Sequence, residues 1–247
     1  MPSAERPSAW TKSNIMTTVA VILLGPPGAG KGTQARRIGQ FFNYPRISTG
    51  DMLREAVRRK SVLGKKARRY IEAGDLVPDV LVDALVKHRL ARKDCRRGFV
   101  LDGYPRTIHQ AEFLESLFPE GALQILAAGI QVRDSVLLER VAGRWTCPKC
   151  GRIFNSASNP SREGKRCDAC NTLLVHRPDD SSAVVRERLQ VYHRMTKPLI
   201  QYYRKRGCYY RINGERSMDE IYEDLKETIL RAQNQPLAAA PRLAAGA

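Results

Sequence analysis

A glycine-rich run with a single lysine carries the clearest chemical signal in this chain: Gly25-Pro26-Pro27-Gly28-Ala29-Gly30-Lys31-Gly32-Thr33. It follows the apolar run Val19–Leu24 and opens a stretch that can be helical, which is the context of a phosphate-binding P-loop. Glycines let backbone N–H groups approach phosphate oxygens, and the start of the helix attracts anions. Lys31 adds positive charge for the end of a triphosphate that is transferred. Because Gly32 stands where Ser or Thr usually follows the lysine, direct ligation of magnesium by a hydroxyl is predicted less firmly here.

Four of the six cysteines form two close pairs, Cys147-x2-Cys150 and Cys167-x2-Cys170. This spacing is typical of a zinc site with four thiolate ligands. Four protein ligands leave no position for a substrate, so the metal would be structural. The pairs lie in a Gly- and Pro-containing stretch, 143–180, which is too small to bury much apolar surface and would be stabilised by a metal. Disulfides, or a lobe that has lost its metal, are the alternatives.

Charge and composition narrow the class of protein. The chain has 42 basic and 25 acidic residues and a net charge of +17, which attracts polyanions. We interpret the excess as a generally basic surface; nucleic-acid contact is the alternative, but no pattern of base-stacking aromatic residues supports it. No apolar run is long enough to span a membrane. The cysteine usage favours a reducing compartment, and we expect a cytoplasmic protein.

Short apolar runs alternate with helical stretches from residue 19 onward, and this alternation predicts a parallel sheet with helices on both faces. Ligands of such a sheet bind beyond the carboxyl ends of its strands, where the P-loop lies. Asp134 and Ser217 are predicted helix N-caps. The predicted strands are Val19–Leu24, Arg46–Ser48, Gly98–Leu101, Leu123–Ile130 and Cys208–Ile212. The predicted helices are Lys31–Phe42, Met52–Arg59, Lys65–Ala73, Val80–Ala91, Ile108–Leu117, Asp134–Val141, Ser181–Arg206 and Ser217–Gln233.

Two further motifs complete a recognisable set. They are Ile47-Ser48-Thr49-Gly50-Asp51-Met52-Leu53-Arg54 and Gly98-Phe99-Val100-Leu101-Asp102-Gly103-Tyr104-Pro105-Arg106-Thr107. With the P-loop, they make the chain resemble the adenylate kinases over about residues 19–231. Supporting segments follow in the family's order: Asp75-Leu76-Val77-Pro78-Asp79, Arg140-Val141-Ala142-Gly143-Arg144, Arg177-Pro178-Asp179-Asp180 and Val185-Arg186-Glu187-Arg188-Leu189.

The resemblance implies a P-loop nucleoside monophosphate kinase fold with two inserted parts. Residues 48–77 would form an AMP-binding insertion, and 143–180 is similar to the lid of the long-lid form of the family. The kinase domain would span 19–231, between a disordered extension, 1–18, and a disordered tail, 232–247. The activity implied is reversible transfer, ATP + AMP to two ADP, by a monomer. We expect hinges near Gly143 and Asp180.

The residues expected at the donor nucleotide follow from the same resemblance. The P-loop would hold the phosphates of ATP, while Arg144 and the lid pair Ile153 and Phe154 would cover the nucleotide. The backbone of Arg216 would meet the adenine, although the family commonly has lysine near that position. The expected ATP-binding residues are Gly28, Ala29, Gly30, Lys31, Gly32, Thr33, Arg140, Arg144, Ile153, Phe154 and Arg216.

The residues expected at the acceptor come mainly from the insertion and from the motif after residue 98. The backbone of 75–77 would read the adenine of AMP with help from Gln110, and Arg54 and Arg106 would hold its phosphate. The expected AMP-binding residues are Thr49, Arg54, Asp75, Leu76, Val77, Gly103, Tyr104, Pro105, Arg106, Gln110, Arg177 and Arg188.

The chemistry of transfer explains why the candidate catalytic residues are cationic. Two nucleotides meeting head to head bring roughly six or seven negative charges together, and transfer needs alignment and neutralisation more than covalent chemistry. An AMP phosphate is already anionic, so no general base is required. Arginine suits phosphate oxygens through its planar fork. The expected catalytic residues are Lys31, Arg106, Arg144, Arg177 and Arg188.

Two metals and two alternative functions complete the expectations. Asp102 would hold Mg²⁺ through its water shell, and the four cysteines would hold structural Zn²⁺. The nearest alternative is a related kinase that uses GTP as donor or another monophosphate as acceptor. The distant alternative is a zinc-ribbon protein that binds nucleic acid through the cysteine lobe and the basic surface.

Overall fold

A five-stranded parallel sheet forms the centre of the computed structural model, which describes residues 17–234. The strand order is β2-β3-β1-β4-β7, so that the strand that leads into the P-loop lies in the middle. The strands are β1 (Thr18–Leu24), β2 (Arg46–Ser48), β3 (Gly98–Asp102), β4 (Leu123–Gln131) and β7 (Tyr209–Asn213). The predicted α/β fold is confirmed, and each predicted strand end agrees to within one residue.

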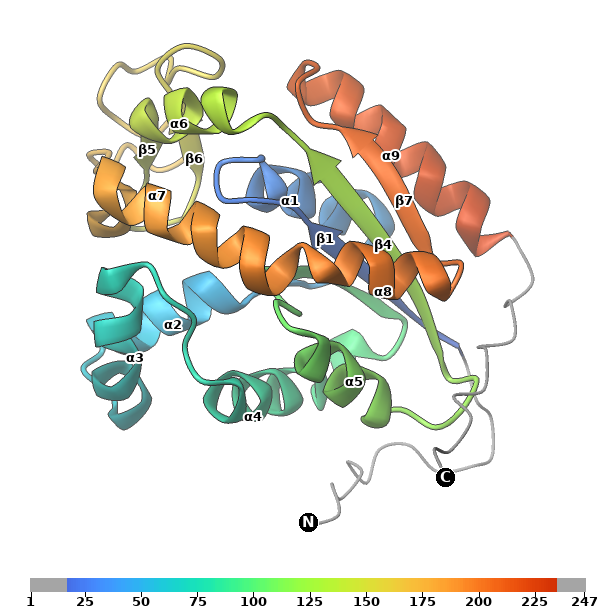
Figure 1. The fold of residues 1–247 in the computed structure, drawn as a ribbon. Coiled ribbons are helices and arrows are strands. Elements are labelled where there is room, and N and C mark those ends of the chain that lie inside the picture. The colour runs from blue at the N-terminus through green and yellow to red at the C-terminus, as the bar shows by residue number, and fades with distance from the viewer. Residues whose placement is uncertain (1–16, 235–247) are drawn as a thin grey trace.

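Helices cover both faces of this sheet (Figure 1). Six α-helices differ from their predicted bounds only at the ends, by one to three residues, and α1 matches them. The α-helices are α1 (Lys31–Phe42), α2 (Thr49–Arg58), α3 (Val62–Ala73), α4 (Asp79–Leu90), α5 (Ile108–Ser116), α6 (Asp134–Ala142), α7 (Ser182–Val191), α8 (Pro198–Lys205) and α9 (Met218–Gln233). The short turns are the 3₁₀ segments η1 (Lys93–Cys95) and η2 (Pro178–Asp180) and the π-helical segment η3 (Tyr192–Thr196).

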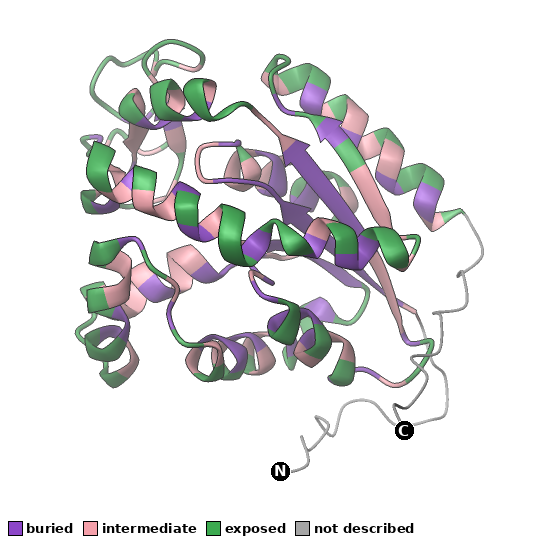
Figure 2. Cartoon of the chain, viewed as in Figure 1, coloured by how far each residue is buried: buried purple, intermediate pink, exposed green. Residues whose placement is uncertain are grey.

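The central strands are buried on both faces, as Figure 2 shows by the purple colour of β1, whereas the edge strand β7 is partly exposed. Successive side chains of β1 point to opposite sides of the sheet, because the side-chain repeat of a strand is two residues. Ala20, Ile22 and Leu24 belong to an apolar cluster with α4, α5 and α8. Val21 and Leu23 belong to a second cluster with α1, α6, α7 and α9. The sheet is therefore held rigidly between two cores, and its carboxyl edge is a fixed platform for a site.

Two expectations about helix ends and continuity need correction. Asp134 is the first residue of α6 and not its N-cap, which is Arg133; the Asp134 carboxylate instead lies 3.1 Å from Nε2 of His193. The predicted helix 181–206 is divided into α7, η3 and α8, because Pro198 has no N–H to continue the ladder and the chain passes through a π-helical turn before it. By contrast, Ser217 caps α9 in a capping box with Glu220, as predicted for that position.

The two inserted parts lie on the same side of the molecule (Figure 1). Helices α2 and α3 follow β2, and a small antiparallel pair, β5 (Arg144–Thr146) and β6 (Ile153–Asn155), begins the cysteine-containing lobe. The ordered elements extend slightly past the predicted domain limits, since Thr18 belongs to β1 and α9 reaches Gln233. The expectations of disorder for 1–16 and 236–247 lie outside the described residues.

Candidate active site and metal centre

The P-loop turns tightly at the carboxyl end of β1. Gly28 and Gly30 have φ angles of 86° and 87°, a region that L side chains rarely adopt, and Gly30 directly precedes α1. Lys31 Nζ donates to the carbonyl oxygens of Gly25 at 2.6 Å and Pro26 at 2.7 Å. Burial lowers the pKa of Lys31 to about 7, although Asp102 acts in the opposite direction. The protonation of this lysine therefore depends on how far it is buried and on the charges beside it.

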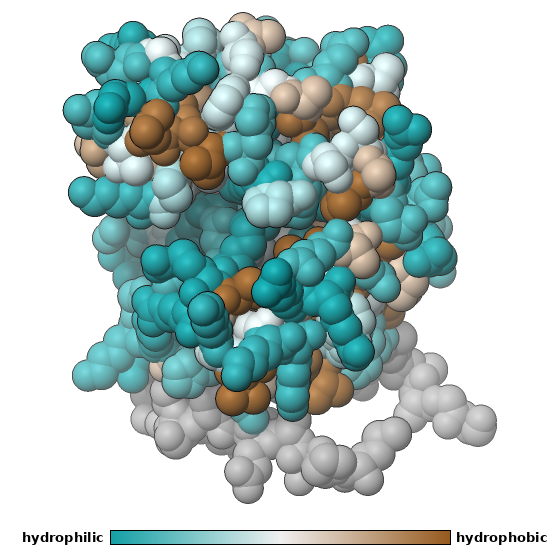
Figure 3. Space-filling view, turned by 90° about the vertical axis from the view of Figure 1, so that its left-hand side faces the viewer, coloured by the Kyte–Doolittle hydropathy of each residue, from teal (hydrophilic) through white to brown (hydrophobic). Residues whose placement is uncertain are grey.

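One cavity of about 450 Å³ lies between the P-loop, the cysteine-containing lobe, α2 and the end of β3. Figure 3 looks into the side where the lobe with β5 and β6 lies above α2 and α3, and it shows a recess with a largely hydrophilic surface between them. The predicted residues that line this cavity are Gly28, Ala29, Gly30, Lys31, Gly32, Thr33, Arg54, Asp102, Gly103, Arg106, Arg140, Arg144, Ile153, Phe154, Arg177, Arg188 and Arg216. Sequence elements far apart therefore converge on one space.

Burial changes the acidity of the clustered arginines. Burial, followed by the neighbouring charge of Arg188, lowers the pKa of Arg106 to about 10. Burial and the charge of Arg54 likewise lower the pKa of Arg177 to about 10. Guanidinium groups placed this close repel one another, so the cluster is a preorganised site for a highly charged anion.

Two carboxylates that the sequence did not predict as partners of these arginines hold them in place. Arg144 makes a two-pronged ion pair with Asp180, and its Nε lies 2.7 Å from Oδ2. Arg188 Nη1 lies 2.9 Å from Asp179 Oδ2, and Arg54 Nη1 lies 3.6 Å from the same oxygen. Asp179 and Asp180 belong to the same four-residue motif as Arg177, so the sequence of that motif could have pointed to them as partners of the arginines. Although burial raises it, Arg188 and Arg54 hold the pKa of Asp179 below its usual range.

Most of the residues predicted to bind the acceptor line a smaller neighbouring pocket. Thr49, Arg54, Arg106 and Gln110 face it, together with the segment 75–77. Both polar atoms of the Gln110 amide already have partners, since Oε1 accepts from the Arg106 N–H at 2.8 Å and Nε2 donates to Asp79 at 2.7 Å. Gln110 therefore shapes the backbone around Arg106 as well as facing the pocket.

Two residues expected at the AMP site line neither of these two pockets. Tyr104 is buried in the core, where its hydroxyl donates to Asp83 Oδ1 at 2.7 Å and not toward either pocket. Pro105 lines a third pocket, which shares Gly103, Arg106 and Arg188 with the other two. The ring of Tyr104 lies in the apolar cluster under β3, so its side chain faces neither pocket.

Arg140 and Arg216 are arranged around the loop after β7. Arg140 Nη1 donates to the carbonyl of Gly214 at 2.8 Å. The Arg216 guanidinium turns away to Glu220 and Asp224, at 3.0 Å and 2.7 Å, which leaves its backbone as the part that can serve the cavity. Arg140 thus fixes the backbone that carries Arg216.

A second acidic group faces the cavity beside Asp102. Asp51 and Asp102 both line it, and both form ion pairs with Arg46, which the sequence analysis left without a role. Although burial raises it, Arg54 and Arg46 hold the pKa of Asp51 well below its usual range. Two carboxylates beside a P-loop offer the hard oxygen atoms that suit the water shell of a magnesium ion.

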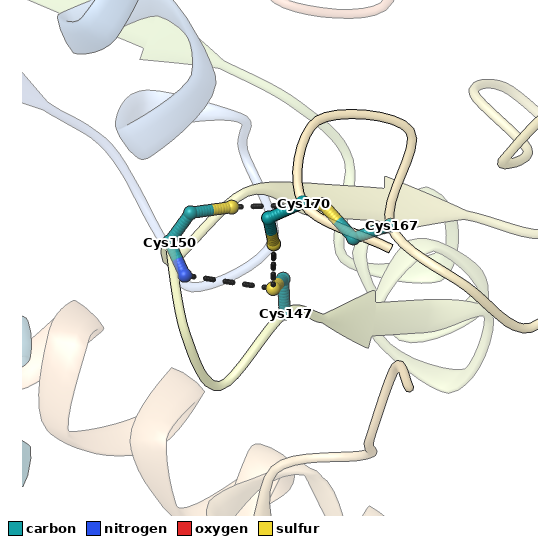
Figure 4. A group of neighbouring side chains, drawn as sticks. All are labelled: Cys147, Cys150, Cys167 and Cys170. Carbon is teal, nitrogen blue, oxygen red and sulfur yellow. Dashed lines mark hydrogen bonds between the residues drawn. The ribbon is translucent and has the colours of Figure 1, made fainter. Parts of the chain in front are cut away.

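The four cysteines come together in the lobe above the cavity (Figure 4). The Sγ atoms of Cys147 and Cys170 are 3.4 Å apart, those of Cys150 and Cys167 are 3.6 Å apart, and all four lie within 4.8 Å of one another. A tetrahedron of sulfurs about 2.3 Å from a zinc ion has edges of about 3.8 Å. The cluster therefore fits a four-thiolate metal such as zinc, and its geometry is that of thiols and not of disulfides.

No helix within residues 17–234 combines the length and the apolar character needed to cross a membrane.

Comparison with known proteins agrees with the arrangement of these motifs. A family model described as adenylate kinase matches residues 23–208. The chain is 46% identical over 211 residues to the adenylate kinase of Caldanaerobacter subterraneus subsp. tengcongensis, covering 85% of this chain and 96% of that protein. The adenylate kinase of Archaeoglobus fulgidus is 44% identical over 207 residues, with 83% and 95% covered. That of Thermotoga neapolitana is 46% identical over 211 residues, with 85% and 96% covered.

Proposed function

The chain belongs to the adenylate kinase family and is an ATP:AMP phosphotransferase, and from this premise we propose how its residues divide the work. The observation that carries the proposal is the convergence of Lys31 and several arginines on one cavity between the P-loop and α2. A cavity lined in this way suits two nucleotides whose phosphates meet, and the family assignment leaves no support for the alternative of a nucleic-acid-binding zinc ribbon.

The donor end of the cavity is proposed to bind ATP. Backbone N–H groups of 28–33 hold its phosphates, and Lys31 neutralises the end that is transferred. Ile153 and Phe154 cover the base and sugar from the lid, and the backbone near Arg216 contacts the adenine. Arg140 holds that backbone through Gly214 and lies close enough to the cavity to assist the phosphates.

The acceptor end is proposed to bind AMP. Thr49 and the backbone of 75–77 contact the nucleoside, and Arg54 and Arg106 hold its phosphate. Between the two ends, Arg144, Arg177 and Arg188 surround the phosphoryl group that moves. They neutralise charge in the transition state while the acceptor oxygen stays aligned with the bond that breaks, so no residue becomes phosphorylated.

The two metals have separate roles in this proposal. Mg²⁺, when bound, would neutralise the donor phosphates and help to align them. Asp102, with Asp51 beside it, would hold the metal's water shell. The cysteines would bind Zn²⁺ and keep the small lobe folded, away from the chemistry. Closure of the lobe and of α2–α3, about hinges near Gly143 and Asp180, would exclude water that could otherwise accept the phosphoryl group.

Steady-state kinetics test this division of the cavity. Changing Arg54 to Ala removes a charge-assisted contact to AMP, so we expect the KM for AMP to rise by about tenfold or more while the KM for ATP changes less than about twofold. Changing Ile153 to Ala removes apolar cover from ATP, so the KM for ATP should rise by about fivefold with little change for AMP. Equal effects of both variants on both KM values would contradict the assignment.

The pKa of Lys31 predicts a proton uptake on ATP binding. In the free protein this pKa is lowered to about 7, so at pH 8.5 the amine is mostly neutral. A bound phosphate favours the ammonium form, so ATP binding should take up a proton, and affinity should fall as the pH rises above about 7. Calorimetry at pH 8.5 in two buffers of different ionisation enthalpy measures the uptake. The Lys31→Arg variant, which stays charged, should show none; equal uptake in both proteins would exclude Lys31 as its source.

A further inference from the structure

Arg46 ties two acidic residues of the cavity together from the first position of β2. A single nitrogen, Nη2, lies 2.7 Å from Asp102 Oδ2 and 2.8 Å from Asp51 Oδ2. Asp102 ends β3, which pairs with β2, while Asp51 lies in the first turn of α2. Because the same nitrogen contacts both carboxylates, the distance between the two oxygens cannot exceed the sum of these two nitrogen–oxygen distances.

This group lies directly beside the phosphate-binding loop. A Cβ built on Gly32 would lie 3.2 Å from both Arg46 Nη2 and Asp102 Oδ2, so the bare glycine leaves the group its space. Arg46, Asp51 and Asp102 all line the same cavity as Lys31. Arg46 Nε is buried and has no hydrogen-bond partner among the described residues. The two carboxylates therefore leave one N–H donor of the guanidinium without an acceptor.

The charges explain what Arg46 accomplishes there. Two carboxylates next to a P-loop disfavour nucleotide phosphates unless a cation lies between them. A hydrated magnesium ion is such a cation when the nucleotide brings it. In its absence the nearest protein cation that contacts both carboxylates is Arg46, because Arg54 contacts Asp51 but pairs otherwise with Asp179.

We propose that Arg46 is a positioning residue for the metal's water shell: it holds Asp51 and Asp102 together and serves as their counter-cation until Mg²⁺ arrives with the nucleotide. The inference rests on the proposed role of Asp102 toward magnesium. Its consequence is that nucleotide binding by this protein depends less on magnesium than it would with a neutral residue at position 46.

The test compares ATP binding with and without magnesium in full-length protein. Calorimetric titrations are run in EDTA and in excess MgCl2 for the native protein and for Arg46→Gln, Arg46→Lys and Arg231→Gln. Arg231→Gln is the matched control, because it removes the same charge from an exposed ion pair with Glu227 near the end of α9. Circular dichroism checks that each variant is folded.

We expect Arg46→Gln to weaken ATP binding in EDTA by about tenfold and to change binding in MgCl2 by less than about threefold. Arg46→Lys, which keeps a charge, should lie closer to the native protein, and Arg231→Gln should match it. Equal weakening in both conditions would make Arg46 a general phosphate ligand, and no change in either would remove it from the site; both contradict the inference. If Arg46→Gln does not fold, Arg46→Lys decides. A ratio of ATP affinity in MgCl2 to ATP affinity in EDTA equal to that of the native protein supports a requirement for positive charge at position 46. Loss of binding in both conditions contradicts it.

These outcomes are distinct from failure of the proposed function. If Asp102→Asn left the effect of magnesium on ATP binding unchanged, the proposed role of Asp102 would be wrong whatever the result for Arg46. If Asp102→Asn abolishes the magnesium effect and Arg46→Gln leaves it unaltered, only the inference about Arg46 is overturned.

Discussion

Replacing Arg106 with alanine should reduce kcat by about a thousandfold, because a guanidinium group that stabilises charge in phosphoryl transfer contributes roughly three to five orders of magnitude. Arg106 lines the cavity, and burial lowers its pKa to about 10. Its Nε donates to Gly103 at 3.0 Å, which aims the rest of the guanidinium toward the cavity. Steady-state assay of ADP formation measures the loss.

Two controls separate catalysis from folding in that experiment. Arg106→Lys keeps a charge but loses the planar fork, so it should recover only part of the activity. Arg97→Ala removes an exposed arginine before β3 and should leave kcat unchanged. Because Arg106 crowds other cations, its loss should not lower the melting temperature. Unimpaired ADP production by a folded Arg106→Ala protein would remove this residue from the transition state.

Replacing Cys147 and Cys150 together with serine should abolish metal binding and lower the melting temperature by about 10 °C or more. The lobe has only a small core of its own, with Phe154, Leu174 and the cysteines, so we expect it to need a bound metal for stability. Turnover at room temperature should fall less than stability does, because the cluster is not in the cavity. Metal analysis, calorimetric melting and the ADP assay, made on one preparation, compare the three quantities.

Cys208→Ser is the matched control for the loss of a thiol. Cys208 lies outside the four-cysteine cluster, with its Sγ 3.6 Å from the carbonyl of Tyr203. We expect that variant to retain one metal per chain. If the native protein held no metal, or if the double serine variant melted at the native temperature, the cluster would not stabilise the lobe.

Periodicity and composition sufficed to predict the sheet. A buried parallel strand is a short apolar run between turn signals, and this pattern located β1 and β4 closely. Helix details were less predictable, since they depend on partners distant in the sequence. Asp134 is of a residue type that often forms an N-cap, but its carboxylate instead contacts His193, which belongs to the π-helical segment. Nothing local to α6 encodes that contact.

The same distinction applies to the site. The P-loop and the cysteine pairs are local motifs, so their residue spacing predicts their geometry. The role of Arg46 depends on the pairing of β2 with β3, which brings it to Asp102, 56 residues away in the chain. Tyr104 lies within a correctly recognised motif, yet its side chain points into the core to meet Asp83. A motif therefore predicts which segment reaches the site but not which of its side chains do.

The stereochemical course of transfer tests the central claim most directly: that a preorganised group of cations moves the phosphoryl group in one step from ATP to AMP. ATP made chiral at its γ-phosphorus with a sulfur atom and oxygen isotopes is turned over with AMP, and the configuration of the product is determined. A single in-line displacement predicts inversion at phosphorus. Retention of configuration, which two successive displacements through a phosphorylated residue would give, would contradict the account.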